Sequence, residues 1–284
     1  MQYNLSVPAP QDLGHPHLLY AGKWEHDLCA IPRTLHSHTD SMEFVYVVSG
    51  QGICELGGKH HPISSGDLIV YNSGVLHNEH LSPSAISMYC ASASGIQLPS
   101  LPPNCLFVDD ILPIFHLGAK STRFHRLFDL IVQEAASGDT RSSAVCQSLF
   151  FALLDMTLDV IDAHQFSDDP DSKKACSLGE RIRSYIDVHI NDKLTVPEIA
   201  RTFGISTSYL ARVFKQTCGC SLASYTVRRR IGEAQTLLLQ TNLSIVEISH
   251  QVGYDNQSYF TKQFTKLSGV PPLRYRKLYS TNLQ

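Results

Sequence analysis

Hydrophobic residues follow two different periods along the chain. Between about residues 28 and 89, short apolar runs alternate with turns rich in Gly, Ser and Asn, and predict strands at 44–48, 53–56, 68–71 and 86–89. Short strands at this spacing are typical of a β-sandwich or a barrel. The run at 44–48 is apolar on both faces, as expected of a strand that is covered on both sides.

The period changes to that of a helix between residues 122 and 165. Apolar residues recur there at spacings of three and four, which predicts two amphipathic helices. The positions are Phe124, Leu127, Phe128 and Ile131, then Val145, Leu149, Leu153, Met156 and Val160. Two uses of their apolar faces stay open: packing against the chain's own barrel, and pairing with a second subunit.

An internal repeat marks the C-terminal third of the chain. Residues 195–200 resemble residues 244–249, and after one inserted residue 208–210 match 258–260. Each copy shows a capping box, a glycine for a turn and an N-cap, so each predicts a helix-turn-helix. These signals are Thr195 with Glu198, Gly204 and Ser206 in the first copy, and Ser244 with Glu247, Gly253 and Asn256 in the second.

A predicted helix at 222–240 separates the two copies. About 20 helical residues span about 30 Å, close to the roughly 34 Å of one DNA turn. Such a helix could hold two recognition helices in successive major grooves. Tandem helical hairpins that serve only as scaffold are the alternative, but hydroxyl, amide and cationic side chains on the outer faces favour nucleic acid.

Composition and charge agree with two unlike domains. The 284 residues are 43% hydrophobic and 17% charged. Residues 1–176 hold 9 Lys+Arg against 19 Asp+Glu, whereas 177–284 hold 14 against 7. A basic half indicates a polyanionic partner. The polar segment SDDPDSKK predicts a linker, so we divide the chain into a β-rich domain with two helices at 1–166, a linker at 167–176 and a DNA-binding domain at 177–284.

The last hundred residues resemble the AraC/XylS family of transcription regulators. The matching positions include Ile199, Ala200, Gly204, Ser206, Tyr209, Leu210, Phe214, Lys215 and Gly219, then Tyr225, Arg230, Ala234 and Leu238, then Glu247, Ile248, Gly253, Tyr254, Ser258, Tyr259, Phe260, Phe264, Gly269, Pro271, Tyr275 and Arg276. Ser249 and Thr265 depart from the usual Ala and Lys, and the second change removes a phosphate contact that the family's Lys would make.

The resemblance implies binding to double-stranded DNA by the start of each recognition helix. The residues at those positions are Thr207, Ser208, Arg212 and Lys215, then Asn256, Gln257, Thr261 and Lys262. Lys215 suits a phosphate contact better than a base. The family further implies an activator that works with RNA polymerase.

A second resemblance lies in the N-terminal domain. His36, His38 and Glu43, followed by His77, resemble the two motifs of the cupin barrel, with Asn72 and Leu81 as departures. His36 and His38 are expected on one face of a strand. In metal-binding cupins these four positions hold a divalent Fe, Mn, Ni or Zn ion. The alternative is an effector pocket lined by the same residues with no cofactor.

The expected fold is therefore α+β with two domains: a cupin-like barrel with a helical hairpin, and an all-α domain with two helix-turn-helix units. The leading function is a ligand-responsive transcription regulator, with a sugar or related metabolite as effector. A metal-dependent cupin enzyme fused to a DNA-binding domain is a second hypothesis, although no nucleophile–base pair supports an enzyme. A third is a ligand-independent DNA binder whose barrel forms a homodimer.

Location follows from what the sequence lacks. It shows no run of about 18 apolar residues and no signal peptide, so we expect no membrane span and a cytoplasmic protein. The eight cysteines are scattered, which indicates free thiols. Cys218 and Cys220 form a lone C-x-C pair, which is weak evidence for zinc.

Overall fold

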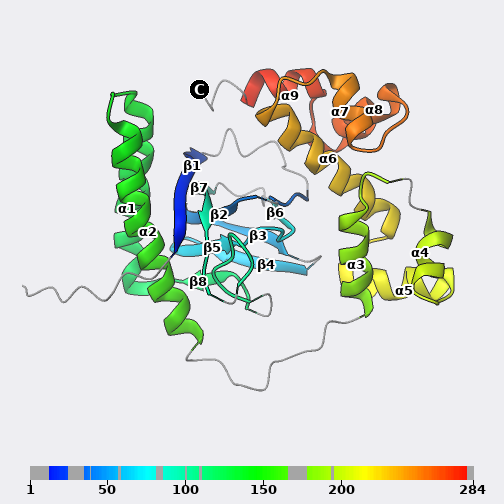
Figure 1. Ribbon diagram of the computed structural model, residues 1–284, viewed down its shortest axis with the longest axis horizontal. Coiled ribbons are helices and arrows are strands. Elements are labelled where there is room, and N and C mark those ends of the chain that lie inside the picture. The colour runs from blue at the N-terminus through cyan, green and yellow to red at the C-terminus, as the bar shows by residue number, and fades with distance from the viewer. Residues whose placement is uncertain are drawn as a thin grey trace, which may run out of the picture.

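A computed structural model describes residues 13–24, 35–38, 40–56, 59–80, 86–99, 101–108, 111–165, 178–192 and 195–279. The strands lie at the centre, a helical hairpin covers one side, and the C-terminal helices lie on the other side (Figure 1). The predicted linker at 167–176 falls outside the described residues.

Two antiparallel sheets build the N-terminal domain. One has five strands in the order β1-β7-β2-β5-β8, and the other has three in the order β4-β3-β6. The strands are β1 Gly14–Trp24, β2 Met42–Ser49, β3 Gln51–Leu56, β4 Lys59–Ser64, β5 Asp67–Tyr71, β6 His77–His80, β7 Ser87–Ile96 and β8 Ile114–His116. This β-rich architecture confirms the predicted cupin-like region.

Four of these strands were predicted and four were not. The predicted runs became β2, β3, β5 and β7, the last of them starting one residue later and running on to Ile96. The missed strands are β1, β4, β6 and β8. Strands β4 (KHHPIS) and β6 (HNEH) are largely polar, and β8 has three residues, so none carries a clear alternation. Pairing with neighbours, which sequence pattern cannot show, makes them strands.

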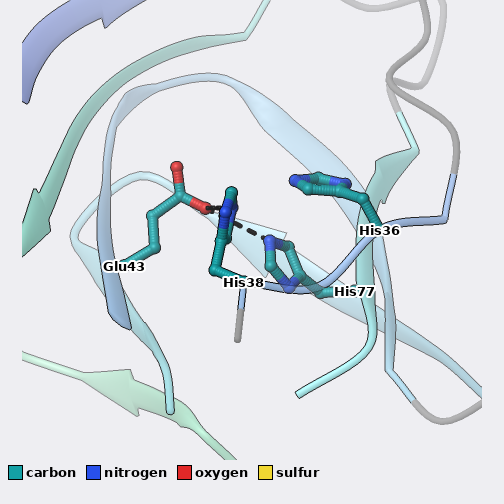
Figure 2. Close-up of side chains that lie close together, drawn as sticks. All are labelled: His36, His38, Glu43 and His77. Atoms are coloured by element: carbon teal, nitrogen blue, oxygen red, sulfur yellow. Dashed lines mark hydrogen bonds and ion pairs between the residues drawn. The ribbon is translucent and has the colours of Figure 1, made fainter. Parts of the chain in front are cut away.

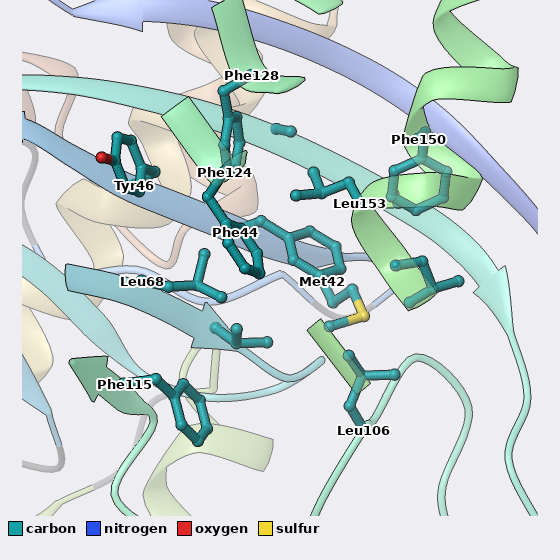
Figure 3. Packing of buried hydrophobic residues seen from close by; sticks show 14 of the residues in the cluster. Met42, Phe44, Tyr46, Leu68, Leu106, Phe115, Phe124, Phe128, Phe150 and Leu153 are labelled. Carbon is teal, nitrogen blue, oxygen red and sulfur yellow. The ribbon is translucent and has the colours of Figure 1, made fainter. Parts of the chain in front are cut away.

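Strand β2 is covered on both sides, as its apolar faces predicted. Phe44 and Tyr46 pack with the helical hairpin in one core cluster, shown in Figure 3. Val45 and Val47 point the other way, into the second cluster between the sheets. The alternation of a strand therefore divides one apolar run between two cores.

The hairpin consists of α1 Ser121–Ser137 and α2 Ser142–Gln165, preceded by the short helix η1 Gly118–Lys120. Phe128, Phe150 and Leu153 are fully buried against the sheet (Figure 3), so packing on the chain's own barrel is confirmed. Among the described residues, Ser142–His164 on α2 are long and apolar enough to cross a membrane, with a mean hydropathy of 1.6, but the core helix of a barrel passes the same test. The absence of a membrane span therefore stays a prediction.

The C-terminal domain is all helical. Its elements are α3 Leu178–Val188, α4 Val196–Thr202, α5 Thr207–Cys218, α6 Leu222–Gln240, α7 Ile245–Gln251, α8 Gln257–Ser268 and α9 Pro272–Tyr279. Helices α4 and α5 form one helix-turn-helix and α7 and α8 the other, while α6 joins them with the predicted bounds. The inward pairs Leu210 with Phe214 and Phe260 with Phe264 are fully buried.

The predicted start signals are all present in the second unit. The Ser244 hydroxyl accepts a hydrogen bond from the Glu247 N–H at 3.2 Å, and the Glu247 carboxylate accepts one from the Ser244 N–H at 2.7 Å. Thr195 and Glu198 form the same box in the first unit. Gly253 then turns the chain at φ +80°, a conformation that glycine adopts without steric cost.

Substituting Ser244→Ala is expected to lower the free energy of unfolding by about 0.5–2 kcal/mol, because it removes the N-cap acceptor. Urea denaturation of the full chain measures the change. Asn242→Ala, an exposed polar position two residues earlier, is the matched control and is expected to change stability by less than about 0.5 kcal/mol. Equal effects of the two substitutions would contradict the capping role.

Ser249 shows how the family departure is accommodated. The residue is fully buried on α7, but its hydroxyl donates to the Val246 carbonyl at 2.8 Å. A buried hydroxyl with a partner costs little. The serine therefore fits where the family's alanine would stand.

Candidate DNA-binding surface and metal-binding cluster

The first recognition helix, α5, presents polar side chains to solvent. Its N-cap Ser206 accepts from the Tyr209 N–H at 3.2 Å, which fixes where the helix begins. The predicted contacts on this helix are all exposed: Thr207, Ser208, Arg212 and Lys215. The opposite face is buried in the core, so α5 is held firmly while its outer face can enter a groove.

The second recognition helix, α8, has the same design. Gln257 and Lys262 are exposed, and Thr261 is half-buried. Asn256 is exposed too, but its side-chain oxygen accepts from the Tyr259 N–H at 2.9 Å. That oxygen serves the helix cap and sets where α8 begins.

Each recognition helix also exposes a tyrosine that the sequence analysis matched to the family but did not place among the DNA contacts. Tyr209 and Tyr259 are 40% and 52% exposed, at equivalent places in the repeat. The Arg212 guanidinium lies over the Tyr209 ring, 5.1 Å from its centroid. Such cation–π contacts orient a guanidinium, and the spacing of three residues on one helix was the available signal.

Arg230 on α6 ties the two helix-turn-helix units together. Its guanidinium donates to the carbonyls of Ile190 and Asp192 beside the first unit, at 2.9 and 2.8 Å, and to that of Gly253 in the turn of the second, at 2.8 Å. Three carbonyl acceptors around one half-buried arginine fix the spacing of the units. The connecting helix is thus a braced spacer, as its length suggested.

A second cluster lies in the barrel, where four predicted residues come together. His36, His38, Glu43 and His77 are all buried, and one ligand atom from each lies within 4.8 Å of the others. Figure 2 shows the three imidazoles and the carboxylate gathered around one point. They come from the segment 35–38, from β2 and from β6, so the fold alone assembles them.

One detail of the expectation is wrong. Residues 35–38 are not part of a strand, and only an isolated bridge links His36 to His77. The two residues exchange backbone hydrogen bonds of 3.0 and 2.9 Å. The imidazoles of His36 and His38 nevertheless lie near each other, with ring centroids 5.2 Å apart. The bridge to β6, and not strand alternation, positions them.

Glu43 lies at the centre of the cluster's polar contacts. Its Oε2 atom is 3.1 Å from His77 Nε2 and 3.4 Å from His38 Nε2. Its Oε1 accepts from the Tyr20 hydroxyl at 2.8 Å and from the Cys90 thiol at 2.6 Å. Tyr20 and Cys90, which sequence reasoning missed, therefore hold one oxygen while the other faces the histidines.

The protonation of His77 follows from its other contact. Its Nδ1 atom lies 2.9 Å from the Val75 carbonyl, which can only accept, so Nδ1 carries the proton. With that proton alone, the ring presents the Nε2 lone pair to Glu43 Oε2; with both nitrogens protonated, Nε2 donates to that oxygen at 3.1 Å. A carbonyl that fixes the proton on the other ring nitrogen is usual for metal-binding histidines.

The residues therefore fit a divalent metal ion. His38 Nε2 is buried and makes no hydrogen bond among the described residues; it lies 3.4 Å from Glu43 Oε2, so both atoms can bind the same ion. Three imidazoles and one carboxylate suit Fe, Mn, Ni or Zn.

The remaining candidate from the sequence is the C-x-C pair. Cys218 is packed in the helical core, where burial raises its pKa to about 12. Neither Cys218 nor Cys220 belongs to a group of three or more potential metal ligands among the described residues, so the C-x-C pair gains no support.

Comparison with known proteins agrees with both domains. Residues 199–278 match a helix-turn-helix domain family, and residues 31–84 match a cupin domain family. The uncharacterised HTH-type transcriptional regulator YdiP of Escherichia coli is 26% identical over 86% of this chain and 81% of its own length.

Two relatives of known role are similar over comparable lengths. The lactose operon transcription activator of Staphylococcus xylosus is 26% identical over 83% of this chain and 84% of its own length. The arabinose operon regulatory protein of Escherichia coli is 25% identical, over 81% and 78%. With two capped helix-turn-helix units behind a cupin domain, the chain belongs to the AraC/XylS family of DNA-binding transcription regulators.

Proposed function

We propose that this regulator responds to a divalent metal ion held by His36, His38, Glu43 and His77. The observation that carries the proposal is the burial of four ligand atoms within 4.8 Å of one another. Buried charges in proteins are paired or coordinate metal ions, and three imidazoles that converge with one carboxylate suit a divalent ion. The ion would be the ligand that the barrel senses, and the helix-turn-helix units would act on DNA.

An organic effector is the competing ligand. A sugar needs room and several spread hydrogen-bonding groups, whereas all four cluster side chains are at most 9% exposed and converge on one point. Elemental analysis separates a metal from an organic effector. The protein is purified without added metal, then incubated with a divalent metal and freed of excess ion. We expect close to one bound metal ion per chain, and a value near zero would reject the metal site.

We infer that the cluster serves regulation and not catalysis. Support comes from the relatives, whose names are those of regulators, and from the burial of the cluster. Measurable turnover by the metal-loaded chain would instead favour the cupin enzyme.

Several partners are proposed with this function. Similarity to the lactose operon activator supports activation of transcription, with RNA polymerase as the partner and the cytoplasm as the location.

The hairpin of α1 and α2 also leaves apolar side chains exposed, among them Leu130, Val145 and Phe151 at 41–51%. A second copy of the chain would cover them as a homodimer, which sedimentation velocity tests.

The exposed cations of the recognition helices supply the prediction for DNA. Arg212→Ala and Lys262→Ala are each expected to weaken operator binding by about 1–3 kcal/mol if the side chain contacts a base. Gel-shift titration at fixed salt measures the change. Arg126→Ala, at an exposed cation on α1, is the control. Unchanged binding by both recognition-helix variants would reject these two contacts.

A further inference from the structure

The barrel and the DNA-binding domain share a hydrophobic core. Leu35 and Leu76 of the barrel are buried in the cluster that also contains Ile186, Leu210 and Phe214 of the first helix-turn-helix region. The three-stranded sheet faces α3 and α6 across this contact (Figure 1). The domains are therefore packed together and not merely tethered.

A buried ion pair crosses the same contact. Arg228 of α6 donates to both carboxylate oxygens of Glu55 on β3, at 3.0 and 2.5 Å. Burial alone would lower the pKa of Arg228, but the bonds and charge of Glu55 outweigh it and the pKa stands above its usual value. The Glu55 side chain is only 4% exposed, so loss of either partner leaves a buried uncompensated charge.

The next residues of α6 touch the segment 35–38. Arg229 donates to the Ser37 hydroxyl at 3.3 Å and to Asp187 of α3 at 3.0 Å. A Cβ added at Gly232 would lie 2.2 Å from the Leu35 carbonyl oxygen and 3.2 Å from the Cβ of His36. Only a glycine lets the helix approach this closely.

Interface residues alternate with cluster residues along the chain. Leu35 precedes His36, Ser37 precedes His38, and Leu76 precedes His77. In each pair the first residue meets the DNA-binding domain and the second belongs to the buried cluster. The backbone bridge between His36 and His77 joins both stretches. The same two stretches thus form one wall of the cluster and one face of the domain contact.

We propose that this contact is a latch between the barrel and α6, and that ligand binding by the cluster favours the latched arrangement. The latch consists of Glu55 with Arg228, Ser37 with Arg229, and Leu35 against Gly232. It rests on the proposed function. Because α6 also carries Arg230, which braces both helix-turn-helix units, closing the latch restricts how the recognition helices are presented to DNA.

Thermodynamic reciprocity makes the latch testable without knowledge of the DNA site. If ligand binding favours the latch, then weakening the latch must lower ligand affinity by the same factor. Two variants weaken it by unrelated chemistry, and neither replaces a cluster residue; Glu55→Gln also makes no contact with the cluster, whereas the Cβ of Gly232→Ala reaches the Cβ of His36. Glu55→Gln removes the charge that pairs with Arg228, and Gly232→Ala places a methyl group against Leu35.

The experiment measures Zn²⁺ affinity of the full chain by calorimetry, with the His38→Ala chain defining Zn²⁺ bound elsewhere. Both latch variants are expected to bind Zn²⁺ roughly 5- to 150-fold more weakly, the usual range of such coupling. The matched controls are Glu134→Gln on α1 and Gly22→Ala on β1, where an added Cβ meets nothing within 4 Å. Both controls should bind Zn²⁺ like the unaltered chain.

A second measurement reports the latch directly. Zn²⁺ should slow amide hydrogen exchange in the middle of α6 in the unaltered chain, and should do so less in either latch variant. Circular dichroism checks that each variant folds. If one of the two latch variants fails to fold, the other still tests the latch.

The outcomes separate the two proposals. Zn²⁺ binding by folded latch variants within twofold of the unaltered chain would overturn the latch and leave the metal site standing. Failure of the unaltered chain to bind Zn²⁺, or Mn²⁺, Fe²⁺ or Ni²⁺ in the same assay, would overturn both.

Discussion

Phe264→Ala is expected to lower the free energy of unfolding by about 3–5 kcal/mol, as is typical when a buried aromatic ring is truncated. The ring is fully buried on α8 and packs against Phe260 and Tyr275, with centroids 5.7 and 5.4 Å away. Its loss leaves a cavity beneath the second recognition helix. A loss of this size is comparable to the whole stability of many domains.

The affinity of the Phe264→Ala chain for DNA should fall together with its stability. Two recognition helices must be present for simultaneous contact, so disorder in α8 leaves only the weak affinity of the first unit. Urea denaturation and gel-shift titration of the same preparation measure both effects. Tyr259→Ala, an aromatic truncation at the exposed face of α8, is the control for stability. A Phe264→Ala chain as stable as the Tyr259→Ala chain would contradict this account of the core.

The second large effect concerns the cluster. His77→Ala is expected to weaken Zn²⁺ binding by more than about 100-fold, since loss even of residues that only support a ligand costs roughly 10- to 100-fold. His77 is the best-placed ligand, because Val75 fixes its tautomer and the Tyr71 ring stacks on it at 3.8 Å. Calorimetry of the full chain measures the affinity, and His250→Ala, an exposed imidazole on α7, is the control.

Loss of a contact that only supports Glu43 should weaken Zn²⁺ binding less than His77→Ala does. Tyr20→Phe keeps the ring but removes the hydroxyl that donates to Glu43 Oε1, and is expected to weaken Zn²⁺ binding roughly 10- to 100-fold. A Tyr20→Phe effect as large as that of His77→Ala would mean that Tyr20 itself is a ligand. No change in either variant would place Zn²⁺ elsewhere on the chain.

Much of the DNA-binding domain was predictable because its signals are local. A capping box, a turn glycine and an inward pair each operate within one or two helical turns, and the repeat presents them twice. Helix α6 has the predicted bounds for the same reason, since Ser221 caps its start by accepting from the Ser224 N–H. Local hydrogen bonds and the helical period of apolar residues specify these elements without reference to distant parts of the chain.

The barrel was less predictable. Strands such as β4 and β6 carry polar residues and exist because β3 pairs with both of them. The segment 35–38 was expected as a strand and is held instead by one bridge. Cross-strand pairing depends on residues far apart in sequence, and a local pattern cannot report it.

Residue types at fixed spacings were enough to predict the family, the two helix-turn-helix units with their capped starts, and the four cluster residues. The orientation of the cluster and the contacts behind it depend instead on tertiary packing. Tyr20 and Cys90 reach Glu43 from strands far away in the chain. Arg228 finds its charge partner 173 residues away on β3. Such contacts arise from the packing of distant segments, which no local spacing encodes.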